Sequence, residues 1–373
     1  MSAFDTPSEL AIRVLSLLRD YHNVLLTGPP ATGKSRLLAE VKYWFAQENT
    51  AIGFAPGQPI AFPQGGLNQS PEWLPSSEKT ARQIFEITFH QGTKYRDFIG
   101  GLAPQTIKDE ATFKVVHGPL YLAAQHAQSD DGAALLIVDE INRGPAIAAF
   151  GDTITAIERD KRLRPDNTKG EFTASFRAID DKGDFQEISL SSHLYLLGAM
   201  NEADTSVEPL DVAFRRRWQL FRLAPDEARL RAFLGLAAPA PADGEGALPN
   251  APTETAHILE AAVQAWSKVN ARIELGRGAE FQLGHGIFMD SMPPATLPAA
   301  QAFAVEVWSR LFSHAAEIFF GDTRGLGFVV GQGAGRPYEV QEKNFADNPV
   351  PVLKKPSIAT DSIYAILRAA AKE

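Results

Sequence analysis

Gly28-Pro29-Pro30-Ala31-Thr32-Gly33-Lys34-Ser35 is the stretch that decides the fold. It follows a short apolar run, 23–26, and precedes a helical pattern over 36–45, so the order is strand, glycine-rich loop, helix, with the spacing GxxxxGK[ST]. The two glycines let successive backbone N–H groups curl around a phosphate without a Cβ clash, and the helix points its positive dipole end at the same phosphate. A chance match in a loop is the alternative, and the flanking strand and helix argue against it. The pattern predicts binding of a nucleoside triphosphate.

The residues of this stretch have separate expected roles. Lys34 should reach the β- and γ-phosphates, and the hydroxyl of Ser35 should bind Mg²⁺. The residues expected to bind nucleotide are Gly28, Pro29, Pro30, Ala31, Thr32, Gly33, Lys34, Ser35 and Arg36. Such a loop contacts phosphates and not the base, and the sequence shows no NKxD-type guanine-binding motif. The substrate could therefore be either ATP or GTP, with ATP slightly favoured.

A second anchor lies at 133–140, where six apolar residues run directly into Asp139 and Glu140. An uninterrupted apolar run is typical of a central parallel strand covered on both faces. Ligands bind at the carboxyl ends of such strands, so we expect Asp139 to orient Mg²⁺ through its water shell and Glu140 to polarise the attacking water. An exposed acidic turn is the alternative, and the phosphate-binding pattern upstream argues against it.

Two further polar features follow. Asn201 comes directly after the apolar run His193–Ala199, where its side chain could hydrogen-bond the γ-phosphate or the water; a turn-forming Asn is the alternative. Arg215, Arg216 and Arg217 end a short helical pattern over 210–218. An arginine run is usually a solvated face, but here it lies where a ring ATPase presents an arginine to its neighbour's γ-phosphate. The three span less than one helical turn, so they cannot all point at one phosphate.

Composition narrows the class of protein. The chain has 373 residues, 45% hydrophobic and 22% charged, as in an ordinary soluble globular protein of two domains or one large α/β domain with an appendage. It has no cysteine, which excludes disulfides, thiolate catalysis and cysteine-based metal sites and fits a cytoplasmic location. The pattern over residues 1–20 is typical of an amphipathic helix and not of a secretion signal. No stretch of the sequence approaches about eighteen uninterrupted apolar residues, so we expect no membrane partner. A net charge of −9 argues against general nucleic-acid binding.

The remaining pattern predicts the other elements. Helices are expected over Pro7–Asp20, Pro119–Ala127, Ile147–Arg159, Pro225–Leu234, Thr253–Ala271, Pro298–Phe320 and Ser357–Lys372. Strands are expected over Ile84–Phe89, Phe113–Val116 and His193–Ala199, with a hairpin that pairs Phe172–Phe176 and Phe185–Ile188. Segments Glu48–Glu78 and Gly321–Pro351 should be irregular, and the domain boundary should fall within Gly235–Pro252.

Several motifs resemble those of one family. They are FHQ at 89–91 with YRDFI at 95–99, DEINRG at 139–144, MNEADTS at 200–206, LDVAFRRRW at 210–218, FQLGHGIFM at 281–289 and AEIFFGD at 316–322. With the phosphate-binding loop they resemble the AAA+ family, within it the McrB-like branch, related to MoxR-type proteins. The resemblance runs from about Leu10 to about Asp322.

The resemblance implies an α/β fold: a P-loop AAA+ core with a parallel sheet flanked by helices, plus a C-terminal helical lid. The core would span 1–235, with a polar insertion over 48–78 and a hairpin over 161–190 ahead of the sensor asparagine, and the lid and tail would span 253–373. Gly101 to Gly118 would correspond to the insertion in helix 2. The sequence departs from the branch where Thr205 replaces an arginine, and because the P-loop begins at Gly28 we expect no separate DNA-reading domain ahead of it.

Carried over by position, the resemblance also implies roles. Asn201 would sense the γ-phosphate. Arg216 and Arg217 would act on the nucleotide of the neighbouring subunit, and Arg215 is a further, less favoured candidate for that role. Asn142 and Asp204 would hold the water or the neighbouring subunit. His285, in a matched motif, would touch nucleotide or simply pack.

The implied function is an ATP- or GTP-hydrolysing, Mg²⁺-dependent ring, expected to be a hexamer. It would drive an effector such as a McrC-like nuclease in DNA restriction or phage defence, with DNA contacted through a partner or the ring pore. One alternative is a MoxR-like chaperone that remodels a protein partner. The other is a nucleotide-gated scaffold, which the intact Glu140 argues against.

Overall fold

The computed structural model describes residues 4, 6–46, 71–107, 110–203, 210–238 and 248–372. Most of the predicted insertion 48–78 lies outside these residues, as do Asp204 and Thr205. The chain divides into two compact units, one of Met1–Thr27 with Lys34–Arg222 and one of Gly28–Gly33 with Leu223–Glu373. The sequence-based domain limits 1–235 and 253–373 remain a prediction.

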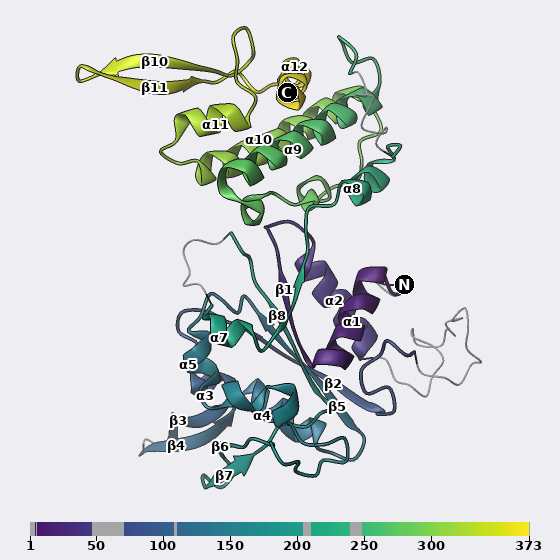
Figure 1. Ribbon diagram of the computed structural model, residues 1–373, viewed down its shortest axis with the longest axis vertical. Coiled ribbons are helices and arrows are strands. Elements are labelled where there is room, and N and C mark those ends of the chain that lie inside the picture. Colours follow the sequence, from purple (N-terminus) through teal and green to yellow (C-terminus); the bar gives the residue numbers. More distant parts are fainter. Residues whose placement is uncertain are drawn as a thin grey trace. The chain divides into compact units, whose positions relative to one another are not determined.

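The first unit has a central sheet of five strands in the order β2-β5-β8-β1-β9, and every neighbouring pair is parallel. The strands are β1 (Asn23–Thr27), β2 (Ala81–Thr88), β5 (Gly132–Asp139), β8 (Leu194–Ala199) and β9 (Gln219–Arg222). Figure 1 shows α1 (Glu9–Tyr21) and α2 (Lys34–Phe45) on one side of this sheet and α4 (Pro119–Ala127) on the other. The predicted α/β fold, a parallel sheet flanked by helices, is confirmed.

Burial explains the central strands. All residues of β1 and β8 are buried, as are those of β5 up to its last residue, because helices cover both faces of the sheet. Register aligns the strand ends: Asn23 at the start of β1 pairs with Leu196, and Thr27 at its end pairs with Arg222. The residues that follow β1, β5 and β8 therefore emerge at one edge of the sheet, where ligands bind in such folds.

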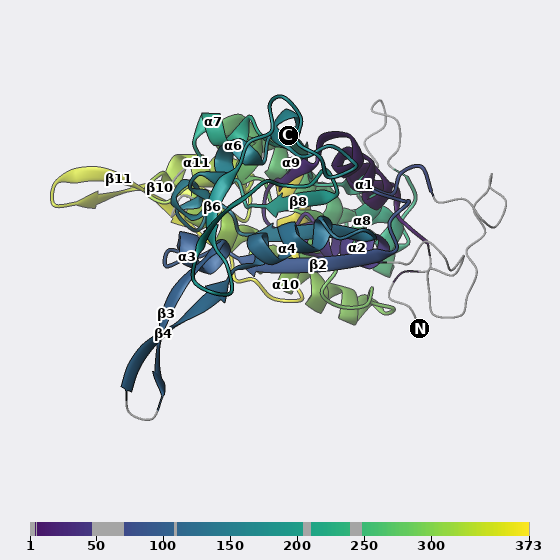
Figure 2. The same ribbon diagram turned by 90° about the horizontal axis from the view of Figure 1, so that it is seen from below.

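Short elements join these strands. They are α3 (Tyr95–Phe98), β3 (Gly100–Ile107), β4 (Glu110–His117), α5 (Ala146–Phe150), α6 (Thr153–Ala156), η1 (Arg159–Lys161), β6 (Phe176–Ile179), β7 (Phe185–Ile188) and α7 (Val212–Arg215). β3 and β4 pair as an antiparallel hairpin that extends away from the sheet of its unit (Figure 2). We predicted only a short strand over Phe113–Val116, so the hairpin is longer than expected. Its first strand was missed because Gly100, Gly101 and Pro104 weaken the strand pattern.

Two predictions ahead of β8 need correction. The single helix expected over Ile147–Arg159 is interrupted at Gly151, whose φ of 50° is left-handed, and a Cβ there would lie 2.8 Å from the ring of Tyr95. The predicted hairpin exists, but its first strand is Phe176–Ile179 and not Phe172–Phe176. The backbone of Asp180 and Asp184 closes its turn, so strand pairing begins after the segment we had chosen.

The C-terminal unit is mainly helical, as predicted. Its elements are α8 (Glu227–Leu234), α9 (Thr255–Arg277), η2 (Ala279–Phe281), η3 (His285–Phe288), α10 (Leu297–Ile318), α11 (Thr323–Val329), β10 (Glu339–Phe345), β11 (Asn348–Lys354) and α12 (Ile363–Ala371). Trp266 of α9 and Trp308 of α10 lie in one buried cluster that also takes Leu230 and Leu234 from α8. None of the helices in the described residues is long and apolar enough to span a membrane.

The segment Gly321–Pro351, which we expected to be irregular, is ordered. It forms α11 and the antiparallel hairpin of β10 and β11, which pairs Glu339 with Lys354 and Phe345 with Asn348 (Figures 1 and 2). The hairpin escaped prediction because its strands are largely polar and β11 contains two prolines, which are rare inside sheets.

Candidate nucleotide site

The predicted phosphate-binding loop has the backbone that such a loop needs. Gly28 and Gly33 have φ angles of 140° and 89°, which side chains rarely adopt, and Ala31 between them has a φ of 60°. The hydroxyl of Thr32 donates to the carbonyl of Pro29 at 3.0 Å and braces the curl from inside. A Cβ at Gly28 would lie 2.2 Å from the carbonyl oxygen of Leu223, so glycine is required there for close approach as well as for φ.

A second glycine-containing segment supports the loop. The amides of Gly284 and Gly286 donate to the carbonyls of Pro30 and Ala31, each at 2.8 Å. A Cβ at Gly284 would lie 2.1 Å from Ala31, so no larger residue fits without moving the loop. We had singled out the motif 281–289 only as part of the resemblance. The sequence Gly284-His285-Gly286 could have indicated this contact, because glycines outside turns often mark a close approach of two backbone segments.

His285 lies between these glycines, and its side chain is packed in the interior, which is one of the two predicted alternatives. It is 3% exposed, and its Nδ1 accepts a hydrogen bond from the amide of Asp226 at 3.1 Å. Burial, and then the charge of Arg229, lowers the pKa of His285 below its usual value. The ring is therefore neutral at neutral pH and holds the start of α8, where the side chain of Asp226 also caps the helix.

Lys34, Ser35 and Arg36 form the first turn of α2. Lys34 is buried, and burial lowers its pKa to about 8, while the nearby charges of Glu140, Glu202 and Asp139 raise it. Ser35 and Arg36 are exposed. The lysine thus lies close enough to the carboxylates at the carboxyl edge of the sheet for their charges to act on it.

The acidic pair ends β5. Asp139 is the last strand residue, and its Oδ1 accepts a hydrogen bond from the amide of Glu140 at 3.0 Å. Glu140 itself has a φ of 51°, a left-handed conformation that is uncommon for a residue with a side chain and concentrates at functional sites. The left-handed turn at Glu140 comes directly after the last strand residue, Asp139.

Two polar side chains contact Glu140, and a third supports one of them. Asn201 Nδ2 donates to Glu140 Oε1 at 3.2 Å, and Arg143 Nε lies 3.2 Å from Glu140 Oε2. Asn142 Nδ2 donates to the carbonyl of Asn201 at 3.1 Å, while Asn142 Oδ1 is buried without a hydrogen-bond partner among the described residues. A buried acceptor of this kind is available to a donor such as a water. The structure thus brings Asn201 to Glu140 and Asn142 to Asn201.

The oxygen donors of this edge suit a hard divalent cation. Ser35 offers a hydroxyl and Asp139 a carboxylate, whereas the described residues contain no group of three or more His, Cys, Asp or Glu side chains that could hold a metal ion. Mg²⁺ in nucleotide sites is usually bound by one or two protein oxygens together with phosphates and waters. These residues therefore fit Mg²⁺ carried by a triphosphate better than a metal bound by protein alone.

The predicted arginines do not join this group. They lie just before β9, whose first residue pairs with Val24 near the start of β1, whereas the phosphate-binding loop follows the end of β1. The five residues of β1 at about 3.3 Å each separate the two edges by roughly 16 Å. Arg215 and Arg216 are exposed, while the side chain of Arg217 is largely buried against Glu158, with Nε 2.8 Å from Oε1.

The arginine segment is held rigidly. Asp211 caps α7 by accepting from the amides of Ala213 and Phe214, and Phe214 packs edge-on against Phe150 with ring centroids 5.0 Å apart. Buried Asn23 donates to the carbonyls of Arg217 and Ile157, at 3.0 and 2.8 Å. Sequence reasoning treated Asn23 only as the start of a strand, because a bridging role depends on residues far away in the chain.

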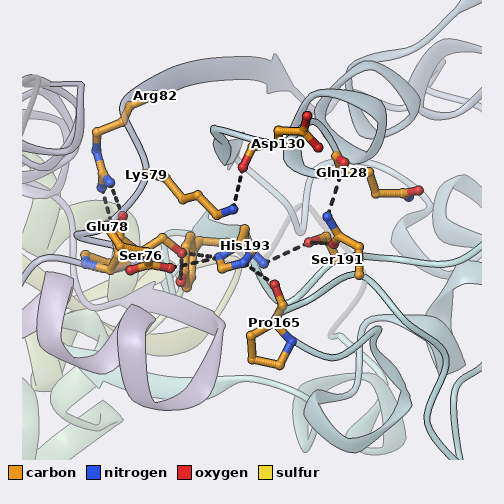
Figure 3. Close-up of polar contacts among 12 residues, drawn as sticks. Ser76, Glu78, Lys79, Arg82, Gln128, Asp130, Pro165, Ser191 and His193 are labelled. Carbon is orange, nitrogen blue, oxygen red and sulfur yellow. Dashed lines mark hydrogen bonds and ion pairs between the residues drawn. The ribbon is translucent and has the colours of Figure 1, made fainter.

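A further polar network lies at the amino end of the same sheet (Figure 3). Ser76 Oγ is 2.7 Å from His193 Nδ1 and 2.6 Å from the hydroxyl of Tyr195, and His193 Nε2 is 2.9 Å from the carbonyl of Pro165. Because a carbonyl only accepts, Nε2 carries the proton and Nδ1 accepts from Ser76. Arg82 donates to the carbonyl of Ser76 at 2.6 Å. This network fixes the entry to β2 against β8, away from the carboxyl edge.

Comparison with known proteins agrees with this geometry. Residues 73–218 match the family model of the AAA domain (dynein-related subfamily). The type IV methyl-directed restriction enzyme EcoKMcrB subunit of Escherichia coli K12 is 26% identical over 317 residues, which are 83% of this chain and 56% of that protein. The type II restriction enzyme BsuMI component YdiS of Bacillus subtilis 168 is 30% identical over 225 residues, 57% of this chain and 61% of that protein.

The chain thus spans between half and two thirds of the length of these curated relatives. Among solved structures, C. elegans PCH-2 is similar over 83% of this chain and 70% of the PCH-2 chain, at 15% sequence identity. The TM-score of 0.37 shows that this likeness is distant. The sequence relatives, the family match and the parallel sheet with its phosphate-binding loop are consistent with one another. The chain contains an AAA-type domain over residues 73–218 and is similar in sequence to McrB-like restriction proteins.

Proposed function

We propose that this protein hydrolyses a nucleoside triphosphate in a homo-oligomeric ring, most simply a hexamer, in which each site is completed by an arginine of the neighbouring copy. The observation that carries the proposal is the separation of roughly 16 Å between the phosphate-binding edge and the arginine edge of one sheet. A guanidinium side chain cannot bridge that separation within one chain. A second copy can bring the two edges together.

Within one chain, each residue has a defined task. The backbone N–H groups of Gly28 and of Ala31 to Gly33, with the ammonium of Lys34, bind the phosphates, and Arg36 lies at the rim. Glu140 accepts a proton from the attacking water as the water oxygen bonds to the γ-phosphorus. The bond from the γ-phosphorus to the bridging oxygen breaks, and the nucleoside diphosphate leaves; Asn201 orients the water. Ser35 and Asp139 would hold Mg²⁺, which would supply charge neutralisation on the phosphate oxygens.

The hydrogen bond from Asn201 to Glu140 supports a resting state in which the base is held back. When a γ-phosphate is bound, Asn201 can turn to it and release the carboxylate for the water. Arg216 of the neighbouring copy then offsets the charge that develops on the phosphate, an effect worth about 10³–10⁵ in rate where it has been measured.

We further propose that hydrolysis drives an effector, a McrC-like nuclease acting on DNA. Support comes from the two relatives, which are named as parts of restriction enzymes. DNA would be contacted through the partner or the ring pore, because the chain's net charge of −9 disfavours general nucleic-acid binding. ATP and GTP both remain candidates as fuel, because the contacts described above are directed at phosphates.

The direct test is hydrolysis by the wild type and by Glu140→Gln, with ATP and GTP and over a range of protein concentration. We expect turnover per chain to rise with concentration as the ring forms, and Glu140→Gln to bind nucleotide but lose at least a hundredfold in turnover. Glu86→Gln is the control, because Glu86 lies on β2 and pairs with Lys42 on the surface. Full turnover by a dilute monomer, or by Glu140→Gln, would disprove the proposal.

A further inference from the structure

The arginine edge contains a cavity of about 540 Å³. Its charged lining consists of Glu158, Arg159, Arg216 and Arg217. Three guanidinium groups face one carboxylate, so the lining has an excess of positive charge in a chain whose net charge is −9. Such a cavity favours an anionic occupant.

The three arginines are not equivalent. Arg217 is neutralised and held, since its Nε lies 2.8 Å from Glu158 Oε1 and its Nη1 donates to the carbonyl of Ala213 at 2.5 Å. Its side chain is only 13% exposed. Arg217 therefore serves as a fixed wall and has little freedom to reach a ligand.

Arg159 and Arg216 are exposed, and neither side chain makes a hydrogen bond or ion pair within the described parts of the chain. They come from different segments, Arg159 from η1 and Arg216 from the end of α7. The Glu158–Arg217 pair joins those segments at the cavity. Asn23 joins the same segments through the carbonyls of Ile157 and Arg217. Two exposed cations are thus presented from segments that these contacts join.

We propose that this cavity receives the terminal phosphate of the triphosphate bound to the neighbouring copy, and that Arg159 and Arg216 contact it together. Arg159 is then a second trans-acting catalytic residue, and Glu158 and Arg217 are positioning residues that set the distance between the two. This inference rests on the proposed ring function and adds to it a residue that the arginine run did not indicate. An acidic segment of the neighbour is the competing occupant.

The test compares Arg159→Gln, Arg216→Gln and the control Arg164→Gln in the full chain. Arg164 is also exposed and lies in the same segment, but it does not line this cavity. For each variant, kcat and KM are measured with the better fuel, and ring mass is measured by light scattering with a non-hydrolysable analogue. We expect Arg159→Gln to lower kcat at least about tenfold with intact ring mass, and Arg164→Gln to change it less than about twofold.

The outcomes separate the two proposals. If Arg216→Gln loses turnover but Arg159→Gln keeps more than half, the cavity assignment is wrong and the ring function stands. If Arg159→Gln loses ring mass instead of kcat, the occupant is an acidic segment and the phosphate assignment is wrong. If neither variant loses turnover, the ring function itself fails.

The positioning role has its own readout. Glu158→Gln releases Arg217, so kcat should fall about fivefold while KM stays within about twofold, and Glu158→Asp should recover part of the loss. A Glu158→Asp variant no better than Glu158→Gln, or equal changes in kcat and KM, would contradict positioning.

Discussion

Replacing Asn23 with alanine should destabilise the first unit and impair turnover more than nucleotide binding. Asn23 is 1% exposed and makes three hydrogen bonds: Nδ2 donates to the carbonyls of Ile157 and Arg217, and Oδ1 accepts from Arg162 at 2.6 Å. Each neutral bond contributes about 1 kcal/mol and the charge-assisted bond about 2 kcal/mol, so the total loss is about 4 kcal/mol. The cost is concentrated at Arg162, which is fully buried and otherwise bonded to backbone carbonyls.

Urea unfolding followed by fluorescence measures the loss, with Asn348→Ala as the control. Asn348 is exposed and donates a single hydrogen bond to the carbonyl of Ala346, so its removal should cost less than about 0.5 kcal/mol. Since Asn23 also tethers the arginine segment, kcat should fall severalfold more than nucleotide affinity does, measured where the variant remains folded. A destabilisation of Asn23→Ala below about 1 kcal/mol would refute the reasoning.

Two further predictions concern nucleotide binding. The pKa of Lys34 is lowered to about 8 in the nucleotide-free protein, and Lys34 must be charged to bind phosphate. The affinity for nucleotide should therefore weaken about tenfold between pH 7 and pH 9. Titration with a fluorescent nucleotide analogue measures this change, and an affinity that does not vary with pH would contradict the prediction. Between pH 8 and 10.5 the unfolded chain binds more protons at this group, so its contribution to stability rises with pH, opposite in sign to the loss of affinity. Gly284→Ala should displace Ala31 and weaken nucleotide binding at least about tenfold. The control variant Gly170→Ala should bind nucleotide normally, because its Cβ would meet only side-chain atoms at 3.5 Å or beyond. Equal affinities of the two variants would show that Gly284 does not support the loop.

Local patterns predicted those parts of the fold whose cause is local. The loop of Gly28 to Gly33, the strand that ends at Asp139 and the helix Pro119–Ala127 were all expected, because each depends on an apolar run or on backbone freedom within a few residues. The helix expected over Ile147–Arg159 failed because Gly151 turns the chain against Tyr95, a contact that periodicity does not reveal. The hairpin over 339–354 failed because polar strands with prolines carry almost no pattern.

The candidate site shows the same division. Lys34, Asp139, Glu140 and Asn201 were predicted because their motifs specify chemistry, and the structure brings them to one edge. The supports could not be predicted: Gly284 acts through its lack of a side chain, and Asn23 acts through carbonyls more than a hundred residues away. Long-range backbone contacts of this kind carry no local signal.

The most direct test of the account mixes two inactive proteins. Glu140→Gln lacks the base but keeps its arginines, and Arg216→Gln keeps its own base but lacks the trans-acting cation. In mixed rings a Glu140→Gln copy donates Arg216 to the intact site of its neighbour, so we predict that the mixture hydrolyses fuel at roughly a quarter of the wild-type rate although neither protein does so alone. A mixture that forms rings but stays inactive, or an Arg216→Gln protein that is fully active alone, would contradict the account.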